Sequence, residues 1–310
     1  MFRIAHVSDP HVLTRTAAQW RSIVFNKRLT GYANLVLRRG RVHRRDYLLS
    51  VLAAAAEQSD HLVVTGDITN LSLEHEYEEA RRLLREVAWR TEVTVVPGNH
   101  DIYLPSIPRN RRFAHHFGEF MASDLPELAR DLPAGSFPFV KLRGAVAFIG
   151  LSSAVPRPPF VAAGYLGRAQ MEALELILAH PAVRVRTPVI LIHHPPFDMR
   201  PRLVQMRDGL VDAAALWATL GALGHAVVLF GHLHVRRRYT LRTASGTVQG
   251  ICAAGAALDH QNAVMRAGFN RYVIDDSSGL ESVEGWVVDP DGGGFEKRPL
   301  EEVVLCEERP

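Results

Sequence analysis

The stretch Val95–Asp101 joins an apolar, β-branched run to three polar residues of different chemistry. The run predicts a buried strand, and the Pro-Gly pair after it predicts a turn at the strand's C-terminal end. The turn delivers Asn99, His100 and Asp101 to the rim of a sheet, where open α/β folds bind their ligands. An amide oxygen can ligate a metal, an imidazole can transfer a proton, and a carboxylate can fix the imidazole tautomer. Taken alone, the heptad is better explained as an ordinary polar turn after a strand.

Four further stretches repeat this arrangement of an apolar strand that ends in acidic or histidine side chains. The expected strands cover residues 2–7, 61–65, 189–192 and 226–230, and they lead into Asp9 and His11, Asp67, His193 and His194, and His232 and His234. Because such strand ends meet at one edge of a sheet, the loops together form a candidate metal centre. Carboxylate, imidazole and carbonyl donors without a thiolate suit borderline-to-hard divalent or trivalent ions.

The elements that must position these loops alternate between strand and helix over the first hundred residues, which predicts a layered α/β sheet. Helices are expected over residues 46–58, 72–87 with Ser72 as N-cap, 109–122, 168–179 and 211–223, and a further strand over 145–151. Residues 195–209 are expected to be a loop whose arginines could contact substrate. From about residue 237 short alternating segments predict antiparallel strands in a second sheet. We find no repeat or linker, so we expect one domain over residues 1–310.

An insertion over residues 12–45 contains nine lysines and arginines, interleaved apolar and aromatic residues, and no acidic residue. A basic amphipathic segment of this kind can lie on an anionic membrane surface or grip a phosphate-rich ligand. It can equally be a helical cap over the site with solvated arginines. The sequence leaves both interpretations open.

The composition is that of a soluble globular protein, with 310 residues, 47% hydrophobic and 22% charged. Cys252 and Cys306 form no disulfide framework, in agreement with a reducing cytosol. No leader segment precedes the first strand, and no apolar run reaches the roughly 18–20 residues that cross a bilayer. A net charge of +3 does not indicate strong nucleic-acid binding. We therefore expect a cytoplasmic protein, with peripheral attachment to the inner membrane as the alternative. Nothing in the sequence specifies an oligomeric state.

The ordered blocks resemble the calcineurin-like metallophosphoesterase family. They are Asp9-x-His11, Gly66-Asp67, Gly98-Asn99-His100-Asp101, His193 and Gly231-His232-x-His234. The resemblance implies an α/β fold built as a four-layer α/β/β/α sandwich, with two metal ions at the C-terminal ends of its strands. By the same resemblance one ion is held by Asp9, His11, Asp67 and His234, and the other by Asp67, Asn99, His193 and His232. Asp67 would bridge the two.

Two such ions can bind one hydroxide as the nucleophile and clamp both oxygens of an in-line phosphoryl displacement. The donor set accepts manganese, iron, zinc or cobalt in divalent or mixed-valence pairs, and we favour manganese and iron. His100 is expected to be the proton donor to the leaving group, with Asp101 orienting its ring. A structural role for His100 is the alternative.

Several other polar residues are expected to lie outside the ligand set. Adjacent side chains on an extended chain point in opposite directions, so His194 should not join His193 at the metals. Asn70 should hold its loop or cap the following helix. His6 should lie in the core, and His115 and His116 should lie at the surface or rim.

The expected activity is hydrolysis of a small-molecule phosphoester. A diester is favoured by resemblance to the bacterial phosphodiesterase branch that includes class III cyclic-nucleotide phosphodiesterases. A pyrophosphatase or phosphodiesterase that acts on a nucleotide-lipid or a phospholipid head group is the alternative, since it suits the basic insertion. A non-catalytic metal-binding scaffold is an alternative of another class. Nucleic-acid cleavage has no recognition motif to support it.

Overall fold

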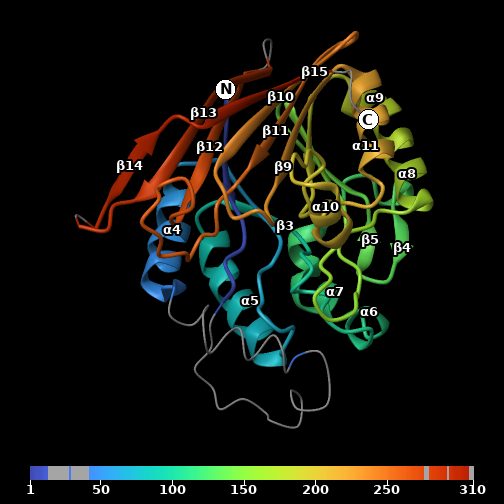
Figure 1. Ribbon diagram of the computed structural model, residues 1–310. Coiled ribbons are helices and arrows are strands. Elements are labelled where there is room, and N and C mark those ends of the chain that lie inside the picture. The colour runs from blue at the N-terminus through green and yellow to red at the C-terminus, as the bar shows by residue number, and fades with distance from the viewer. Residues whose placement is uncertain (13–27, 29–41, 276–278, 292, 307–310) are drawn as a thin grey trace.

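Two β-sheets stacked face to face form the centre of the structure, a computed structural model that describes residues 1–12, 28, 42–275, 279–291 and 293–306 (Figure 1). The first sheet has the strand order β14-β13-β12-β1-β2-β3 and the second β15-β10-β11-β9-β8-β7-β6. The strands β1–β3 run parallel to one another, as do β7, β8, β9 and β11. A short hairpin pairs β4 with β5. Most of the predicted insertion at residues 12–45 lies outside the described residues.

The strands have the following bounds: β1 Phe2–Val7, β2 His61–Thr65, β3 Glu92–Val96, β4 Arg130–Leu132, β5 Gly135–Phe137, β6 Phe139–Arg143, β7 Val146–Gly150, β8 Thr187–Leu191, β9 His225–Phe230, β10 Arg237–Thr243, β11 Gly246–Cys252, β12 Gly268–Asp275, β13 Gly279–Val288, β14 Phe295–Arg298 and β15 Glu301–Cys306. The helices are α4 Arg45–Glu57, α5 Glu74–Ala88, α6 Ser106–Arg109, α7 Arg112–Phe117, α8 Arg168–Ala179, α9 Pro181–Arg184, α10 Arg202–Asp208 and α11 Ala213–Leu223, with 3₁₀ turns at Gly118–Met121 and Pro126–Leu128.

Alternation along the strands divides the core into layers. In β8, Val189 and Leu191 join the cluster between the sheets, whereas Ile190 joins the cluster on the outer face beneath α8 and α11. This is the period-two pattern of a strand buried on both faces. Helices α4 and α5 cover the first sheet in the same way (Figure 1). The observed order of helix, sheet, sheet and helix confirms the predicted α/β sandwich.

The C-terminal strands differ from the prediction of a separate antiparallel sheet. Strands β12–β14 extend the first sheet beyond β1, while β10, β11 and β15 extend the second sheet beyond β9. Two of these pairings are parallel, β9 with β11 and β10 with β15. The physical reason is that the βα units leave the edges of β1 and β9 with unpaired backbone groups, and the returning chain pairs with both edges.

Three local predictions need correction: one helix cap, one helix and one loop. Ser72 does not cap α5, because its backbone is left-handed (φ 53°) and its hydroxyl donates to the carbonyl of His100. The Glu76 carboxylate caps the helix instead and accepts from the backbone N–H groups of Leu71 and Leu73 at 2.9 and 3.0 Å. The helix expected over residues 109–122 is broken at Arg111, also left-handed, into α6, α7 and a 3₁₀ turn. The loop expected over residues 195–209 contains α10.

The structure also places His116 in the interior rather than at the surface. Its ring stacks on Tyr77 at a centroid distance of 5.0 Å, and its Nε2 lies 2.7 Å from a Glu74 carboxylate oxygen. His115 is exposed, as expected. Within the described residues no helix is both long and apolar enough to cross a membrane.

The imidazole of His61 makes the folded state sensitive to acid. His61 is fully buried in β2, its Nε2 lies 2.7 Å from the Thr94 hydroxyl, and its ring stacks on Phe148. Burial lowers its pKa from 6.5 to about 3, because the opposing charge of Glu92 is too weak to compensate. Between pH 6.5 and about 3, His61 binds a proton in the unfolded chain but not in the folded chain. The free energy of unfolding must therefore fall as the pH falls.

We expect His61→Gln to flatten the loss of stability between pH 6.5 and about 3, measured as the urea midpoint at several pH values. The pH-dependent loss from one such group is at most about 1.4 kcal/mol per pH unit. His115→Gln, which changes an exposed imidazole, is the matched control and should keep the wild-type slope. An unchanged slope in His61→Gln would show that other groups cause the acid sensitivity.

Candidate metal centre

The seven expected metal ligands converge where the two sheets meet, at the C-terminal ends of five parallel strands. Strands β1, β2 and β3 of the first sheet lead into Asp9, His11, Asp67 and Asn99, and strands β8 and β9 of the second sheet lead into His193, His232 and His234. Neither sheet holds the complete set. The site therefore requires that the sheets stack in register.

The first group of potential ligands consists of Asp9, His11 and His234. Their ligand atoms lie within 4.8 Å of one another, and Asp9 Oδ1 is 3.2 Å from His234 Nε2. The two imidazole rings stack with their centroids 5.5 Å apart. Asp67 Oδ2 lies 3.8 Å from His11 Nε2, so the second carboxylate borders this group.

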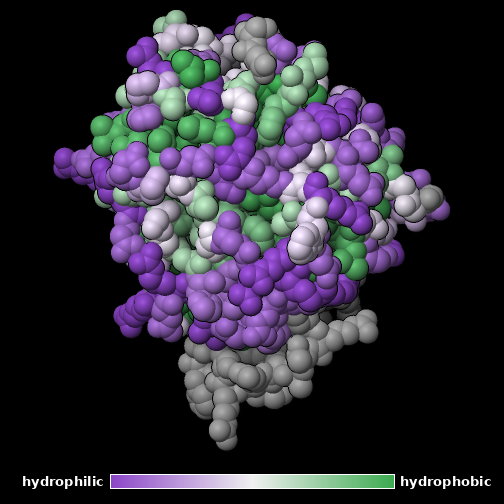
Figure 2. Space-filling view, turned by 180° about the vertical axis from the view of Figure 1, so that it is seen from behind, coloured by the Kyte–Doolittle hydropathy of each residue, from purple (hydrophilic) through white to green (hydrophobic). Residues whose placement is uncertain are grey.

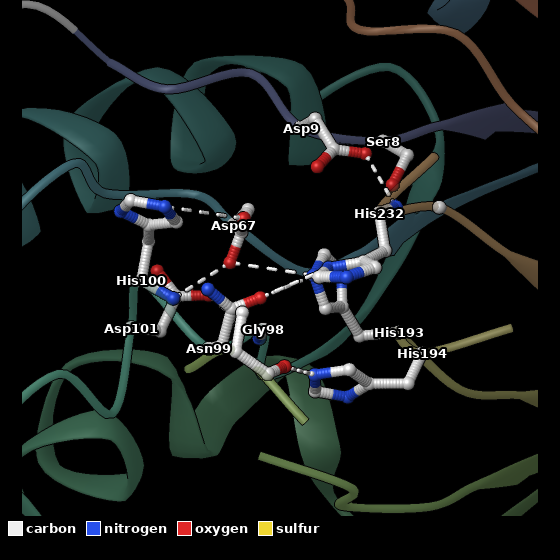
Figure 3. Close-up of polar contacts among 12 residues, drawn as sticks. Ser8, Asp9, Asp67, Gly98, Asn99, His100, Asp101, His193, His194 and His232 are labelled. Carbon is white, nitrogen blue, oxygen red and sulfur yellow. Dashed lines mark hydrogen bonds and ion pairs between the residues drawn. The ribbon is translucent and has the colours of Figure 1, made fainter. Parts of the chain in front are cut away.

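The second group gathers around Asn99 (Figure 3). Its side-chain oxygen lies 3.1 Å from His193 Nε2 and 3.1 Å from His232 Nδ1, and these two nitrogens are 3.2 Å apart. Asp67 Oδ1 is 3.4 Å from His193 Nε2. Asp67 thus lies between the two groups, as the resemblance implied. Asp9 also comes within 4.8 Å of both Asp67 and His193, so both carboxylates reach both groups.

The backbone is left-handed at five of the seven expected ligands. These are Asp9 (φ 49°), His11 (41°), Asp67 (51°), His232 (67°) and His234 (53°). Each such residue costs about 1–2 kcal/mol relative to ordinary backbone. The sharp turns bring side chains from successive loop positions back over the strand ends, and backbone strain of this kind concentrates at functional sites.

Two glycines allow the loops to approach so closely. A Cβ atom at Gly98 would overlap Asp67 Oδ1, and one at Gly231 would lie 2.5 Å from Asp9 Oδ2. Any side chain at either position would displace one of the two carboxylates. The Gly-Asn and Gly-His pairs of the sequence are therefore steric requirements of the site as well as turn signals.

Backbone carbonyls fix which imidazole nitrogen faces the cluster. Nδ1–H of His193 donates to the Thr65 carbonyl at 2.7 Å, and Nδ1–H of His11 donates to the Thr69 carbonyl at 3.3 Å. Each contact leaves Nε2 directed toward the carboxylates. Such outer contacts orient ligating histidines and set their tautomer in metalloproteins.

The electrostatics of the cluster suit a cation. Asp9 and Asp67 are buried, which by itself raises their pKa values, yet the surrounding histidines lower the pKa of Asp9 to about 2 and hold the pKa of Asp67 well below its usual value. Burial lowers the pKa of His193, but Asp67 and Asp9 outweigh it and raise that pKa to about 9. Asp9 Oδ1 receives no hydrogen bond within the described part of the chain. Buried anionic oxygens surrounded by imidazole and amide donors fit divalent metal ions.

His100 lies beside Asp67 without belonging to either group of potential ligands (Figure 3). Its backbone N–H donates to Asp67 Oδ1 at 2.7 Å, and its ring Nε2 is 4.0 Å from Asp67 Oδ2. Its Nδ1–H donates to the backbone carbonyl of Asn70. Nε2 is therefore the ring nitrogen on the side of Asp67 and the potential ligands.

The ring-orienting role predicted for Asp101 is wrong. Its buried carboxylate accepts from the backbone N–H groups of Gly98 (2.9 Å), Ile68 (3.2 Å) and Thr69 (2.8 Å) and from the Thr69 hydroxyl (2.9 Å). Burial and the Asp67 charge raise the pKa of Asp101 to about 7, against the effect of these donors. Asp101 clamps the loops after β2 and β3 together. The carbonyl of Asn70 orients the His100 ring instead.

The remaining polar residues support the loops. His194 is buried, accepts from the Ser153 hydroxyl at 2.8 Å and donates to the Ala162 carbonyl at 2.8 Å. The Asn70 amide donates to the Val12 carbonyl, and His6 contacts Tyr272 and Thr65 within the core. These positions agree with the expectations that none of the three belongs to the ligand set.

Sequence reasoning missed His43, whose buried ring stacks on His11 at a centroid distance of 5.2 Å. His43 also pairs through its backbone with Leu258. No strand-and-turn pattern precedes it, so the spacing signal that identified the other histidines is absent at this position. Its pairing with a segment more than 200 residues away brings it to the site.

Comparisons with known proteins agree with this geometry. The family model described as calcineurin-like phosphoesterase matches residues 2–236. The structure is similar to the purple acid phosphatase PPD1 from yellow lupin seeds, with 10% sequence identity and a TM-score of 0.59. That similarity covers 97% of this chain and 54% of the lupin protein, so this chain spans about half of that protein's length.

Two further solved structures show weaker similarity. TT1561 of Thermus thermophilus has 12% identity and a TM-score of 0.45, covering 90% of this chain and 97% of that one. Zinc-complexed Vps29 from Entamoeba histolytica has 14% identity and a TM-score of 0.37, covering 96% and 98%. Among curated proteins, none matches the sequence.

The clamp made by Asp101 predicts a stability defect in Asp101→Asn. An amide in place of the carboxylate turns its NH₂ group toward backbone N–H groups. The free energy of unfolding should therefore fall by about 2 kcal/mol. We expect a lower urea midpoint for the metal-free variant. His100→Gln, which keeps a donor for the Asn70 carbonyl, serves as the comparison and should stay close to the wild type. A normal midpoint for Asp101→Asn would contradict the clamp.

Proposed function

We propose that this chain, which belongs to the calcineurin-like phosphoesterase family, is a metal-dependent phosphoester hydrolase whose preferred substrates are phosphodiesters. The observation that carries the proposal is the charge around the two carboxylates. The described partners of Asp9 and Asp67 are imidazoles and backbone N–H groups. A diester carries one negative charge and a monoester two, so a diester needs less positive charge from the protein. A site that offers imidazoles and backbone N–H groups therefore favours the diester.

We assign the metal ligands as the sequence motifs imply. Asp9, His11, Asp67 and His234 would hold one ion, and Asp67, Asn99, His193 and His232 would hold the other. The measured separations support this division, because Asn99, His193 and His232 converge at 3.1–3.2 Å and Asp67 lies between that group and His11. When bound, such ions supply an activated water and neutralise charge on the phosphoryl oxygens.

His100 supplies the proton that the leaving group needs. Its Nδ1–H is held by the Asn70 carbonyl, so Nε2 must carry a second proton for the ring to act as an acid. The neighbouring carboxylate of Asp67, 4.0 Å from Nε2, stabilises that imidazolium. The carboxylate and the carbonyl together hold a proton donor next to the metal groups. A non-catalytic scaffold would have no use for this arrangement.

The first test compares turnover of bis-p-nitrophenyl phosphate and p-nitrophenyl phosphate by the manganese-loaded protein. We expect kcat/KM for the diester to exceed that for the monoester. Asn99→Ala should lose at least about 100-fold on the diester, because a bound metal contributes several kcal/mol of charge stabilisation. A monoester preference would contradict the diester proposal while leaving the metal-dependent hydrolase in place.

A second test separates the proton donor from the metal ligands. His100→Gln should lose little on bis-p-nitrophenyl phosphate, whose nitrophenolate leaves without protonation. On a diester with an alkoxide leaving group, such as a cyclic nucleotide, it should lose about 10²–10⁴-fold. Metal content, measured on the same samples, should stay at the wild-type level. Equal losses on both substrates would mean that His100 acts in binding or structure instead.

A further inference from the structure

Four large apolar side chains around α10 are unusually exposed. Phe160, Met199, Leu203 and Met206 have between 67% and 80% of their surface accessible to solvent. Helix α10 has no fully buried residue, and its leucine and methionine, Leu203 and Met206, are exposed. Exposed apolar residues scattered singly are ordinary, whereas several in one place mark an interaction surface.

Hydrogen bonds hold these residues in one surface. The N–H of Ala162 donates to the carbonyl of Arg207, which places the Phe160 loop along the C-terminal end of α10. The side chain of Gln205 donates to the carbonyls of Asp198 and Arg200, which ties the Met199 segment to the same helix. We call this surface the α10 rim, and it consists of Phe160, Met199, Leu203 and Met206 with Arg200, Arg202 and Arg207.

The α10 rim is joined to the metal centre through His194. The Nε2–H of His194 donates to the Ala162 carbonyl in the Phe160 loop, and its ring lies 4.7 Å from the ring of His232. The chain also passes directly from His193 through residues 195–201 into α10 (Figure 1). The segment that carries the rim therefore begins directly after the expected metal ligand His193, and the Phe160 loop of the rim is hydrogen-bonded to His194.

The charged groups that the α10 rim exposes to solvent are mainly arginines. Arg207 is 58% exposed while its partner Asp208, 2.6 Å away, is 17% exposed. Arg200 and Asp198 repeat the arrangement at 32% and 7%. Arg202 is exposed as well. The acidic partners lie beneath the arginines, so an approaching surface meets guanidinium groups and apolar side chains together.

We propose that the α10 rim docks on the surface of a membrane that contains anionic phospholipids. Leucine, methionine and phenylalanine would enter the boundary between head groups and acyl chains, and the arginines would remain at the level of the phosphates. The positive outward charge complements an anionic leaflet. Docking would present the metal centre to phosphodiesters of the head-group layer. The docking step itself does not depend on the diester preference proposed above.

The α10 rim is a different part of the sequence from the basic insertion over residues 12–45, for which a membrane role is one of two expectations from the sequence. Figure 2 shows the molecule from the side opposite to Figure 1, with apolar side chains gathered mainly in its upper part and hydrophilic ones below. Leu176 in α8 and Val185 after α9 are exposed apolar residues remote in sequence from the rim, and they provide matched controls.

The test measures co-sedimentation of the full chain with vesicles of phosphatidylcholine, with and without phosphatidylglycerol. We expect binding that requires phosphatidylglycerol and weakens with added salt. Leu203→Ser with Met206→Ser should reduce the bound-to-free ratio at least about tenfold, because two large apolar side chains no longer gain burial. Leu176→Ser with Val185→Ser should bind as the wild type does. Phe160→Asn, which suits the left-handed backbone at that position, provides an independent variant with the same expected loss.

Three outcomes would overturn the proposal. The wild type does not bind the anionic vesicles; or the rim variants bind as well as the wild type, which would assign membrane binding to another surface; or the wild type self-associates through the rim, seen as a dimer that the double variant loses. Turnover of the soluble diester, which the rim variants should keep, is measured in parallel. Loss of vesicle binding with normal turnover separates failure of the rim from failure of the catalytic proposal.

Discussion

The repulsion between two buried carboxylates is the constraint on which the site depends. Asp9 and Asp67 lie almost without solvent at the junction of the sheets and within reach of the same histidine, His193. Burying one charge is costly and burying two of the same sign more so, unless opposite charge is supplied close by. Imidazoles supply part of it, since the carboxylates raise the pKa of His193 to about 9. A pair of metal ions would supply the rest in a form that does not depend on protonation.

The charged groups of the site come from both sheets, so the balance of charge around the carboxylates depends on how the two sheets stack. The first sheet contributes both carboxylates, while His193 and His232 come from the second. The apolar cluster between the sheets, with Phe148 and Val189 among its members, fixes their separation. Because interiors are packed as densely as crystals, a change in that cluster is transmitted to the strand ends. The core thus sets the distances between ligands as well as the stability.

The sequence was sufficient for the features that repeat locally and insufficient for those that depend on distant contacts. Each expected ligand comes after an apolar strand, in a loop that contains glycine or proline, so Asp67 or His232 could be recognised from its own neighbours. The role of Asp101 could not, because its carboxylate serves backbone groups more than 30 residues away. Ser72 looked like a helix cap for the same reason, since its hydroxyl is engaged by the loop of His100. The C-terminal strands could likewise pair with the free edge of either sheet. The local alternation of polar and apolar residues does not indicate which edge each strand joins.

The left-handed backbone at five expected ligands has a consequence for how such a protein can change over generations. Glycine and asparagine adopt this conformation at lower cost than other residues. A substitution of Asp9 or Asp67 by glycine would relieve the backbone strain and the repulsion between the two carboxylates. The same substitution would remove a metal ligand and with it the chemistry. Selection for the reaction therefore keeps side chains at positions where the backbone alone favours glycine.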